Sequence, residues 1–241
     1  MEFYDNHQVA IEVDNDGVNR YVAKVFGWMF LGLILTALST FFIVVGIQFS
    51  TAFAQMIASL SQLIFVVFIA QVLLVGYISV RVEKMNPSTA VILFLLYAIT
   101  NGFTVGLFAL LYAGSVIVTA FAITAVSFGV MAVYGLKTNQ DLTKMGNLLR
   151  MGLIGLIILS VVNIFMGNSA LDFLICLAGL VIFLGLTAHD TKKIKSHYAQ
   201  VSLSGDVRLA NNLAIIGALS LYLNFINLFM FILRLMTGGR R

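Results

Sequence analysis

The sequence ALDFLICLAGLVIFLGLTAHDTKKIK, residues 170–195, joins a long apolar segment to a basic one. From Ala170 to Ala188 almost every residue is apolar, and the first of several lysines follows at Lys192. About 20 mainly apolar residues in a helix cross a bilayer, because the hydrocarbon layer is about 30 Å thick and each residue rises about 1.5 Å. The pattern therefore predicts a membrane-spanning helix that ends at a charged membrane surface.

The composition extends this prediction to the whole chain. Of the 241 residues, 61% are hydrophobic and 10% are charged, and the mean hydropathy is +1.03. These values lie far outside the range of soluble domains. We therefore predict an all-α integral membrane protein with seven transmembrane helices. The apolar runs that predict them are Val22 to Ile47, Met56 to Val80, Ser88 to Leu111, Ser115 to Leu136, Met145 to Met166, Ala170 to Ala188, and Leu209 to Met236.

The chain divides into a short tail and one membrane domain. Residues 1–21 are predicted to be an acidic cytoplasmic tail, and residues 22–241 to be the seven-helix transmembrane domain. The tail has no basic head or small-residue cleavage site, so the first apolar run is predicted to be a retained span rather than a signal peptide. Of the joints, only Thr191 to Arg208 is long and polar enough to carry structure or a partner site.

Lysine and arginine mark one side of the predicted bundle. They precede the first span and lie in the joints between spans two and three, four and five, and six and seven, while the other three joints have none. By the positive-inside rule this places the N-terminus in the cytoplasm. Arg234, Arg240 and Arg241 would then lie outside, unless the last segment re-enters and returns to the cytoplasm. We expect seven full spans.

The seventh span carries the most polar side chains into the membrane. Ser220, Asn224 and Asn227 are spaced four and three residues apart and so share one helix face. This face is a candidate ion path inside the bundle. The simpler interpretation is that the amides only hold helices together. Gln71 and Asn101, in other spans, fit that second role better than any chemistry.

Asp190 is the leading candidate for a functional group. It follows His189 at the carboxyl end of the sixth span, where the helix dipole disfavours a negative charge. Ionisable groups at membrane depth are costly and by default mark a functional site. A compensating cation is therefore expected, either Arg81 at the end of the second span or Lys192 and Lys193. The alternative is an ordinary interfacial salt bridge.

Motifs of common enzyme classes are missing from the sequence. It contains no Walker loop, no dinucleotide-binding glycine pattern and no metal-site spacing of histidine or cysteine. We predict no enzyme, no catalytic residue, no cofactor and no nucleic-acid partner. The histidines are expected to be solvent or interface residues, and the single cysteine, Cys176, excludes an intrachain disulfide.

Three segments together resemble one family. GLTAHDTKKIK (185–195), ALSLYLNFINLFMFILR (218–234) and VRVEKMNPSTAVILFLLYAITNGFTVG (80–106) resemble the transmembrane Bax inhibitor motif family, in its bacterial branch. The resemblance runs from about Val22 to Met236. It implies six helices around a central seventh, a multi-pass location in the plasma membrane of a bacterium, and a pH-sensitive calcium leak.

The resemblance also implies a site. In the family two aspartates, on helices six and seven, share a proton, and an arginine near the end of helix two latches them. Asp190 matches the first aspartate, Asn224 stands where the second would be, and Arg81 is the candidate for the latch. An amide at position 224 removes the mutual repulsion of two carboxylates. It also leaves Asp190 as a weak candidate calcium ligand, since calcium favours several charged oxygens.

These observations lead to one main hypothesis and two alternatives. The main one is a passive leak for calcium or a related cation, gated by protonation of Asp190 at the contact between the sixth and seventh spans. The first alternative is a regulatory protein without intrinsic transport, which binds a membrane protease or another complex through its acidic tail and its basic joint. It predicts co-purification that is lost when residues 1–19 are deleted. The second is a proton-coupled solute carrier.

Overall fold

The computed structural model describes residues 15–238, and this part of the chain is helical without strands. Seven of its helices are long and apolar enough to cross a membrane, which confirms the predicted fold class. The described part of the chain also contains a short helix, α2, and a 3-10 turn, η1. The elements are α1 (Asn15–Phe49), α2 (Thr51–Ser61), α3 (Ile64–Arg81), η1 (Val82–Lys84), α4 (Pro87–Ala109), α5 (Gly114–Lys137), α6 (Thr143–Met166), α7 (Ser169–Ser204) and α8 (Val207–Gly238).

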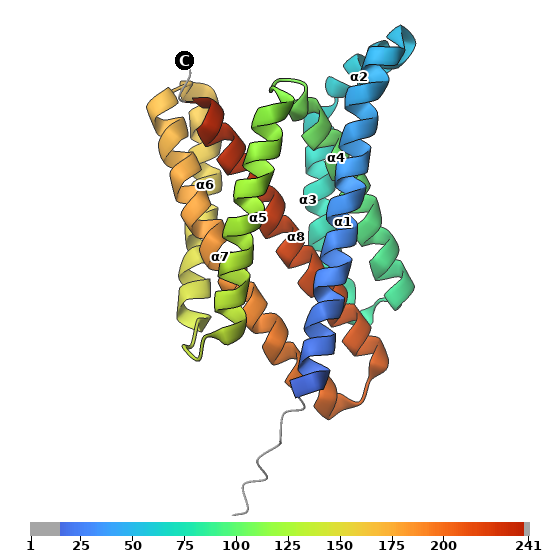
Figure 1. Cartoon of the computed structure of the whole chain (residues 1–241), viewed down its shortest axis with the longest axis vertical. Helices are drawn as coiled ribbons and strands as arrows, with labels where there is room; N and C mark the ends of the chain where they lie inside the picture. The colour runs from blue at the N-terminus through green and yellow to red at the C-terminus, as the bar shows by residue number, and fades with distance from the viewer. Residues whose placement is uncertain (1–14, 239–241) are drawn as a thin grey trace, which may run out of the picture.

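Helix α8 is the central element of the bundle. It runs diagonally between a group formed by α1, α3 and α4 and a group formed by α5, α6 and α7 (Figure 1). It packs against α7, α1, α5 and α4, while α3 packs on α4 and α6 packs on α7. In its most apolar window 61% of the residues are buried, against at most 33% in the other spans. The predicted central seventh helix is therefore confirmed.

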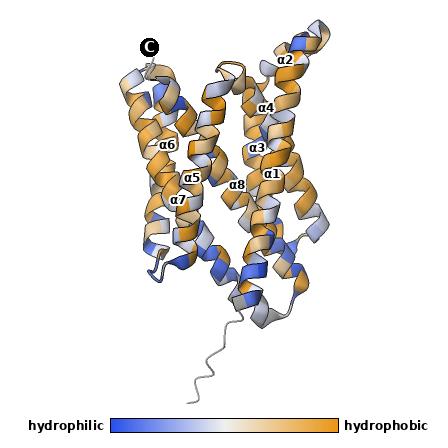
Figure 2. Ribbon diagram, viewed as in Figure 1, coloured by the Kyte–Doolittle hydropathy of each residue, from blue (hydrophilic) through white to orange (hydrophobic). Residues whose placement is uncertain are grey.

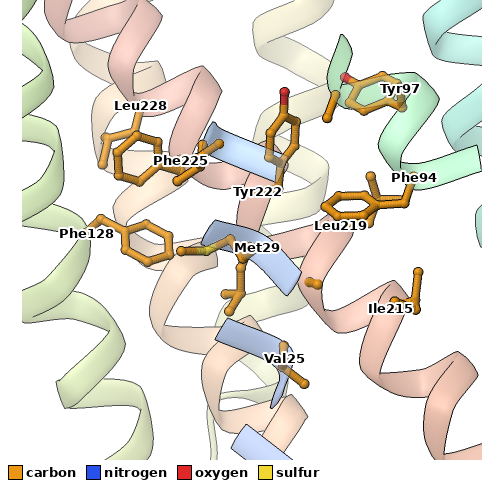
Figure 3. Close-up of a cluster of buried hydrophobic side chains, with 14 of the residues drawn as sticks. Val25, Met29, Phe94, Tyr97, Phe128, Ile215, Leu219, Tyr222, Phe225 and Leu228 are labelled. Atoms are coloured by element: carbon orange, nitrogen blue, oxygen red, sulfur yellow. The ribbon is translucent and has the colours of Figure 1, made fainter. Parts of the chain in front are cut away.

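The core around Tyr222 explains how α8 tolerates polar side chains. The rings of Phe94 and Tyr97 on α4 each lie 5.8 Å from the Tyr222 ring, edge to face (Figure 3). The Tyr222 hydroxyl lies 2.6 Å from Oγ1 of Thr36 on α1 and accepts a hydrogen bond of 2.8 Å from Nδ2 of Asn101 on α4. Each polar atom is thereby paired between helices, as a low-dielectric interior requires. The predicted joining role of Asn101 is confirmed.

Two of the predicted element boundaries were wrong. The run from Met56 to Val80 is interrupted, because α2 ends at Ser61 and α3 starts at Ile64. At this break the hydroxyls of Ser59 and Ser61 donate to the carbonyls of Gln55 and Ala58 in the same helix. Apolar length alone does not reveal this interruption.

The predicted joint after the sixth span is mostly helical. Helix α7 continues to Ser204, and Ile194 is buried against Gly217 of α8. Thr191 and Ile194 are both buried, so the first part of this segment packs inside the bundle although its sequence is polar. At the other end of the chain, residues 15–21 of the predicted tail belong to α1, and the rest of the tail lies outside the described residues.

The two ends of the bundle differ in charge. Hydrophilic residues gather at the end where α1 begins and where the joints α3–α4 and α5–α6 lie (Figure 2). At the opposite end, Arg234 of α8 forms an ion pair with Asp172 in the first turn of α7. Helix α8 reaches this end as one continuous helix, so up to Gly238 the chain does not turn back. The pairing with Asp172 explains how Arg234 is accommodated at the side that the positive-inside rule leaves poor in cations.

Candidate functional site

Asp190 lies on α7 where this helix contacts both α5 and α8. On α7 the neighbouring residues Ala188 and Thr191 are fully buried, and the Asp190 side chain retains 16% exposure. Gly135 of α5 packs directly on the Ala188 carbonyl, and a Cβ at position 135 would overlap that oxygen. The absence of a side chain at Gly135 therefore lets α5 approach α7 two residues before Asp190.

Both carboxylate oxygens of Asp190 have a neutral or titratable partner rather than a lysine or arginine. Asn224 of the central helix donates from Nδ2 to Oδ2 of Asp190 at 2.8 Å. His189 lies with Nδ1 at 2.9 Å from Oδ1. The pairing of Asp190 with Asn224, which the resemblance implied, is thus present as a direct hydrogen bond between α7 and α8.

His189 is a residue of the site that the sequence did not single out. Its side chain is buried, and its imidazole lies against Gly146 of α6, where a Cβ would overlap the ring. Consecutive helical residues do not usually face one another, so proximity in sequence was no reason to expect a contact with Asp190. The useful signal was the glycine, since a small residue on a membrane helix permits close approach of a neighbour.

Arg81 is not brought to Asp190 in this conformation. It is exposed at the end of α3, and among the described residues no ion pair joins it to the carboxylate. The next residue, Val82, accepts a hydrogen bond of 2.7 Å from Nδ2 of Asn212 on α8. Asn212 and Asn224 are separated along α8 by about 18 Å at about 1.5 Å per residue. The contact of Arg81 with this site stays a prediction.

The lysines that follow Asp190 bind elsewhere. Lys192 donates to the carbonyl of Gln140, and Lys195 donates to that of Leu136 at 3.3 Å. Lys193 is exposed. These contacts satisfy carbonyls at and beyond the end of α5, where a cation is favourable. They do not supply the cation that the sequence predicted for Asp190.

Only one member of the predicted polar face joins another helix in the described part of the chain. Asn224 reaches Asp190, whereas Asn227 donates from Nδ2 to the Leu223 carbonyl of its own helix at 2.8 Å. Ser220 is half-buried. The role of Ser220 and Asn227 in an ion path stays a prediction.

The site is a poor fit for a resident metal ion. Within residues 15–238 no group of three or more histidine, cysteine, aspartate or glutamate side chains could hold one. Asp190 and the Asn224 amide offer few oxygens, and calcium takes six to eight.

Comparisons with known proteins cover nearly the whole chain. Residues 18–241 match the family described as "Inhibitor of apoptosis-promoting Bax1". The chain is 37% identical over 228 residues to inner membrane protein YbhL of Escherichia coli (strain K12), covering 93% of this chain and 94% of the relative. It is 39% identical to the uncharacterized protein RP147 of Rickettsia prowazekii, with coverage of 94% and 92%. It is 30% identical to the uncharacterized membrane protein SpyM3_0260 of Streptococcus pyogenes, with coverage of 95% and 97%.

Proposed function

Because the chain belongs to the Bax inhibitor-like family of membrane proteins, we propose that it is a pH-sensitive passive leak for calcium or a related cation in a bacterial inner membrane. The contact between α7 and α8 is its gate, and Asp190 is the proton-sensitive element. The observation that carries this proposal is the hydrogen bond from Asn224 to Asp190. It is the point where the central helix meets a half-buried carboxylate.

The gate depends on the charge of Asp190. An ionised carboxylate accepts hydrogen bonds about twice as strongly as a neutral group, so the charged form holds Asn224 firmly. Protonation converts one oxygen into a donor and weakens the contact. Acid therefore favours a conformation in which α7 and α8 separate, and the leak increases as pH falls. The shift between the two conformations is limited to the difference in free energy of this contact.

The cation is cargo rather than a resident ligand. Conduction requires binding that is strong enough for entry and weak enough for exit. One carboxylate with one amide oxygen meets that condition, since calcium affinity grows with each added charged oxygen. The polar residues of α8 that lie beyond Asn224, including Asn227, continue the path toward the other membrane surface.

Calcium flux in proteoliposomes, measured across a pH series from acid to mildly alkaline conditions, tests the proposal. Wild type is expected to leak faster in acid. Asp190→Asn mimics the neutral carboxyl, so it is expected to leak at all pH values with little pH dependence. Asp172→Asn is the matched control, because it makes the same change on the same helix at the opposite end.

The outcomes separate the candidate functions. Identical fluxes for wild type and Asp190→Asn at every pH contradict the assignment of the gate. Absence of flux in wild type at every pH contradicts a leak and favours the alternative role, a binding protein without intrinsic transport. Retained pH dependence in Asp172→Asn shows that the effect belongs to Asp190 and not to any acidic residue of α7.

A further inference from the structure

A cavity separate from the gate opens between α1, α4 and α8. Its volume is about 360 Å³, and it lies at the end of the bundle where the basic joints are. The residues that line it are Lys24, Trp28, Pro87, Ser88, Val91, Ile92, Asn211 and Ile215. Three helices therefore contribute, each near the point where its apolar run begins.

The lining is divided by polarity. Lys24, Ser88 and Asn211 form the polar part, and the Lys24 ammonium donates a hydrogen bond to Oδ1 of Asn211. This partner is a neutral amide, and among the described residues no carboxylate forms an ion pair with Lys24. Trp28 and Ile92 provide apolar surface beside it, with the Ile92 side chain 63% exposed toward the lipid. A phospholipid has the matching division, with a charged head group next to apolar acyl chains.

Several neighbouring features favour an anion at the polar part. Arg20 lies one helical turn before Lys24 on α1, and both are exposed. Helix α4 begins at Pro87 without a side-chain cap and without an acidic residue in its first turn. The N–H groups of Thr89 and Ala90 donate to the Asn86 carbonyl, so what favours negative charge beside Ser88 is the positive end of the α4 helix dipole. Basic pockets between membrane helices on the cytoplasmic side are known to take anionic lipid head groups.

We propose that this cavity binds an anionic phospholipid of the cytoplasmic leaflet. Its phosphate lies against Lys24 and the start of α4, and one acyl chain lies along Trp28, Val91 and Ile92. The lipid thereby joins α1 and α4 to the first turns of the central helix α8. The proposal concerns residues far from Asp190, so it holds or fails independently of the proposed leak.

Trp28 makes the site directly observable, because it is the single tryptophan of the chain. The full-length protein is reconstituted in phosphatidylcholine vesicles that contain a fixed fraction of chain-brominated phosphatidylglycerol or of chain-brominated phosphatidylcholine. Quenching of Trp28 fluorescence reports lipid in contact with the ring. We expect a preference for phosphatidylglycerol of about fivefold, the ratio that corresponds to about 1 kcal/mol for one basic residue at a membrane surface.

Matched variants test the assignment to Lys24. Lys24→Gln is expected to quench equally with both lipids, while Lys24→Arg retains the preference and shows that the fold tolerates substitution there. Lys193→Gln removes an exposed lysine at the same end of the bundle but on α7, and it is expected to behave as wild type. Circular dichroism checks helix content in each variant.

Three results overturn the proposal. The first is equal quenching by the two lipids in wild type, and the second is an undiminished preference in Lys24→Gln. The third concerns the source of the phosphate. If millimolar inorganic phosphate or glycerol 3-phosphate abolishes the quenching preference, the cavity is a site for a soluble phosphate and not for a lipid.

Discussion

The amide nitrogen of Asn224 lies 2.8 Å from Oδ2 of Asp190, and this hydrogen bond ties the most buried helix to α7. The same carboxylate lies 2.9 Å from the imidazole of His189, which packs on Gly146 of α6. One acidic residue is thus connected to two other helices, α8 and α6. A change in its protonation is expected to be transmitted to both.

Asn224→Asp places a second carboxylate opposite Asp190. Two facing carboxylates resist double ionisation, so the pair retains a proton at higher pH than one carboxylate does. We expect calcium flux to respond to pH over a range shifted upward, and bound calcium to slow the flux more strongly because charge is added.

Asn227→Asp is the control for this substitution. It adds the same charge one turn further along α8, at a side chain that binds its own helix instead of Asp190. If both variants shift the pH response equally, the effect comes from general charge on α8 and not from a carboxylate pair.

Gly146→Ala is expected to destabilise the protein. The added Cβ would overlap the His189 ring, and overpacking of this kind costs about 1–3 kcal/mol. The free energy of unfolding in detergent micelles measures the loss. Gly155→Ala, on the same helix with open space around it, is expected to gain up to about 1 kcal/mol, since alanine favours a helix more than glycine does.

A double variant identifies the cause of that loss. When His189→Ala is combined with Gly146→Ala, the ring that the new Cβ meets is absent, so much of the lost stability is expected to return. If Gly146→Ala lowers the free energy of unfolding as much in the His189→Ala background as in wild type, the proposed overlap with the His189 ring is wrong.

Tyr222→Phe tests the polar cluster of the core. It removes the hydroxyl that accepts from Asn101 and lies beside Thr36, leaving the Asn101 amide without that partner. Hydrogen bonds between membrane helices contribute about 0.6 kcal/mol on average and up to about 1.7 kcal/mol. We expect a loss of unfolding free energy in that range, whereas Tyr77→Phe, at a side chain 52% exposed, leaves it unchanged.

Cysteine labelling tests the predicted orientation. In a Cys176→Ala background, Asn139→Cys and Asn168→Cys place single thiols at exposed positions in the joints at opposite ends of α6. A membrane-impermeant maleimide is expected to label position 139 only in inverted vesicles and position 168 only in right-side-out vesicles. The reverse pattern contradicts a cytoplasmic N-terminus.

The predicted spans agree with the helices where local composition controls the result. The span predicted from Ser115 to Leu136 is observed as helix α5, Gly114–Lys137. The span predicted from Met145 to Met166 is observed as helix α6, Thr143–Met166. The split between α2 and α3 was missed because it falls inside a run that was predicted as one apolar span. The extension of α7 was missed because Ile194 is buried by residues of other helices, among them Gly217 of α8.

The sequence alone determined that this is a seven-span membrane protein with Asp190 near one surface, because transfer of a helix into lipid depends on its own length and apolar content. The tertiary structure decided what Asp190 touches. Asn224 and His189, and not Arg81, became its neighbours because the rotation and tilt of each helix are set by contacts between residues far apart in the chain. The close approaches at Gly135 and at Gly146 are two such contacts, and no local pattern in the sequence identifies which helix packs against each glycine.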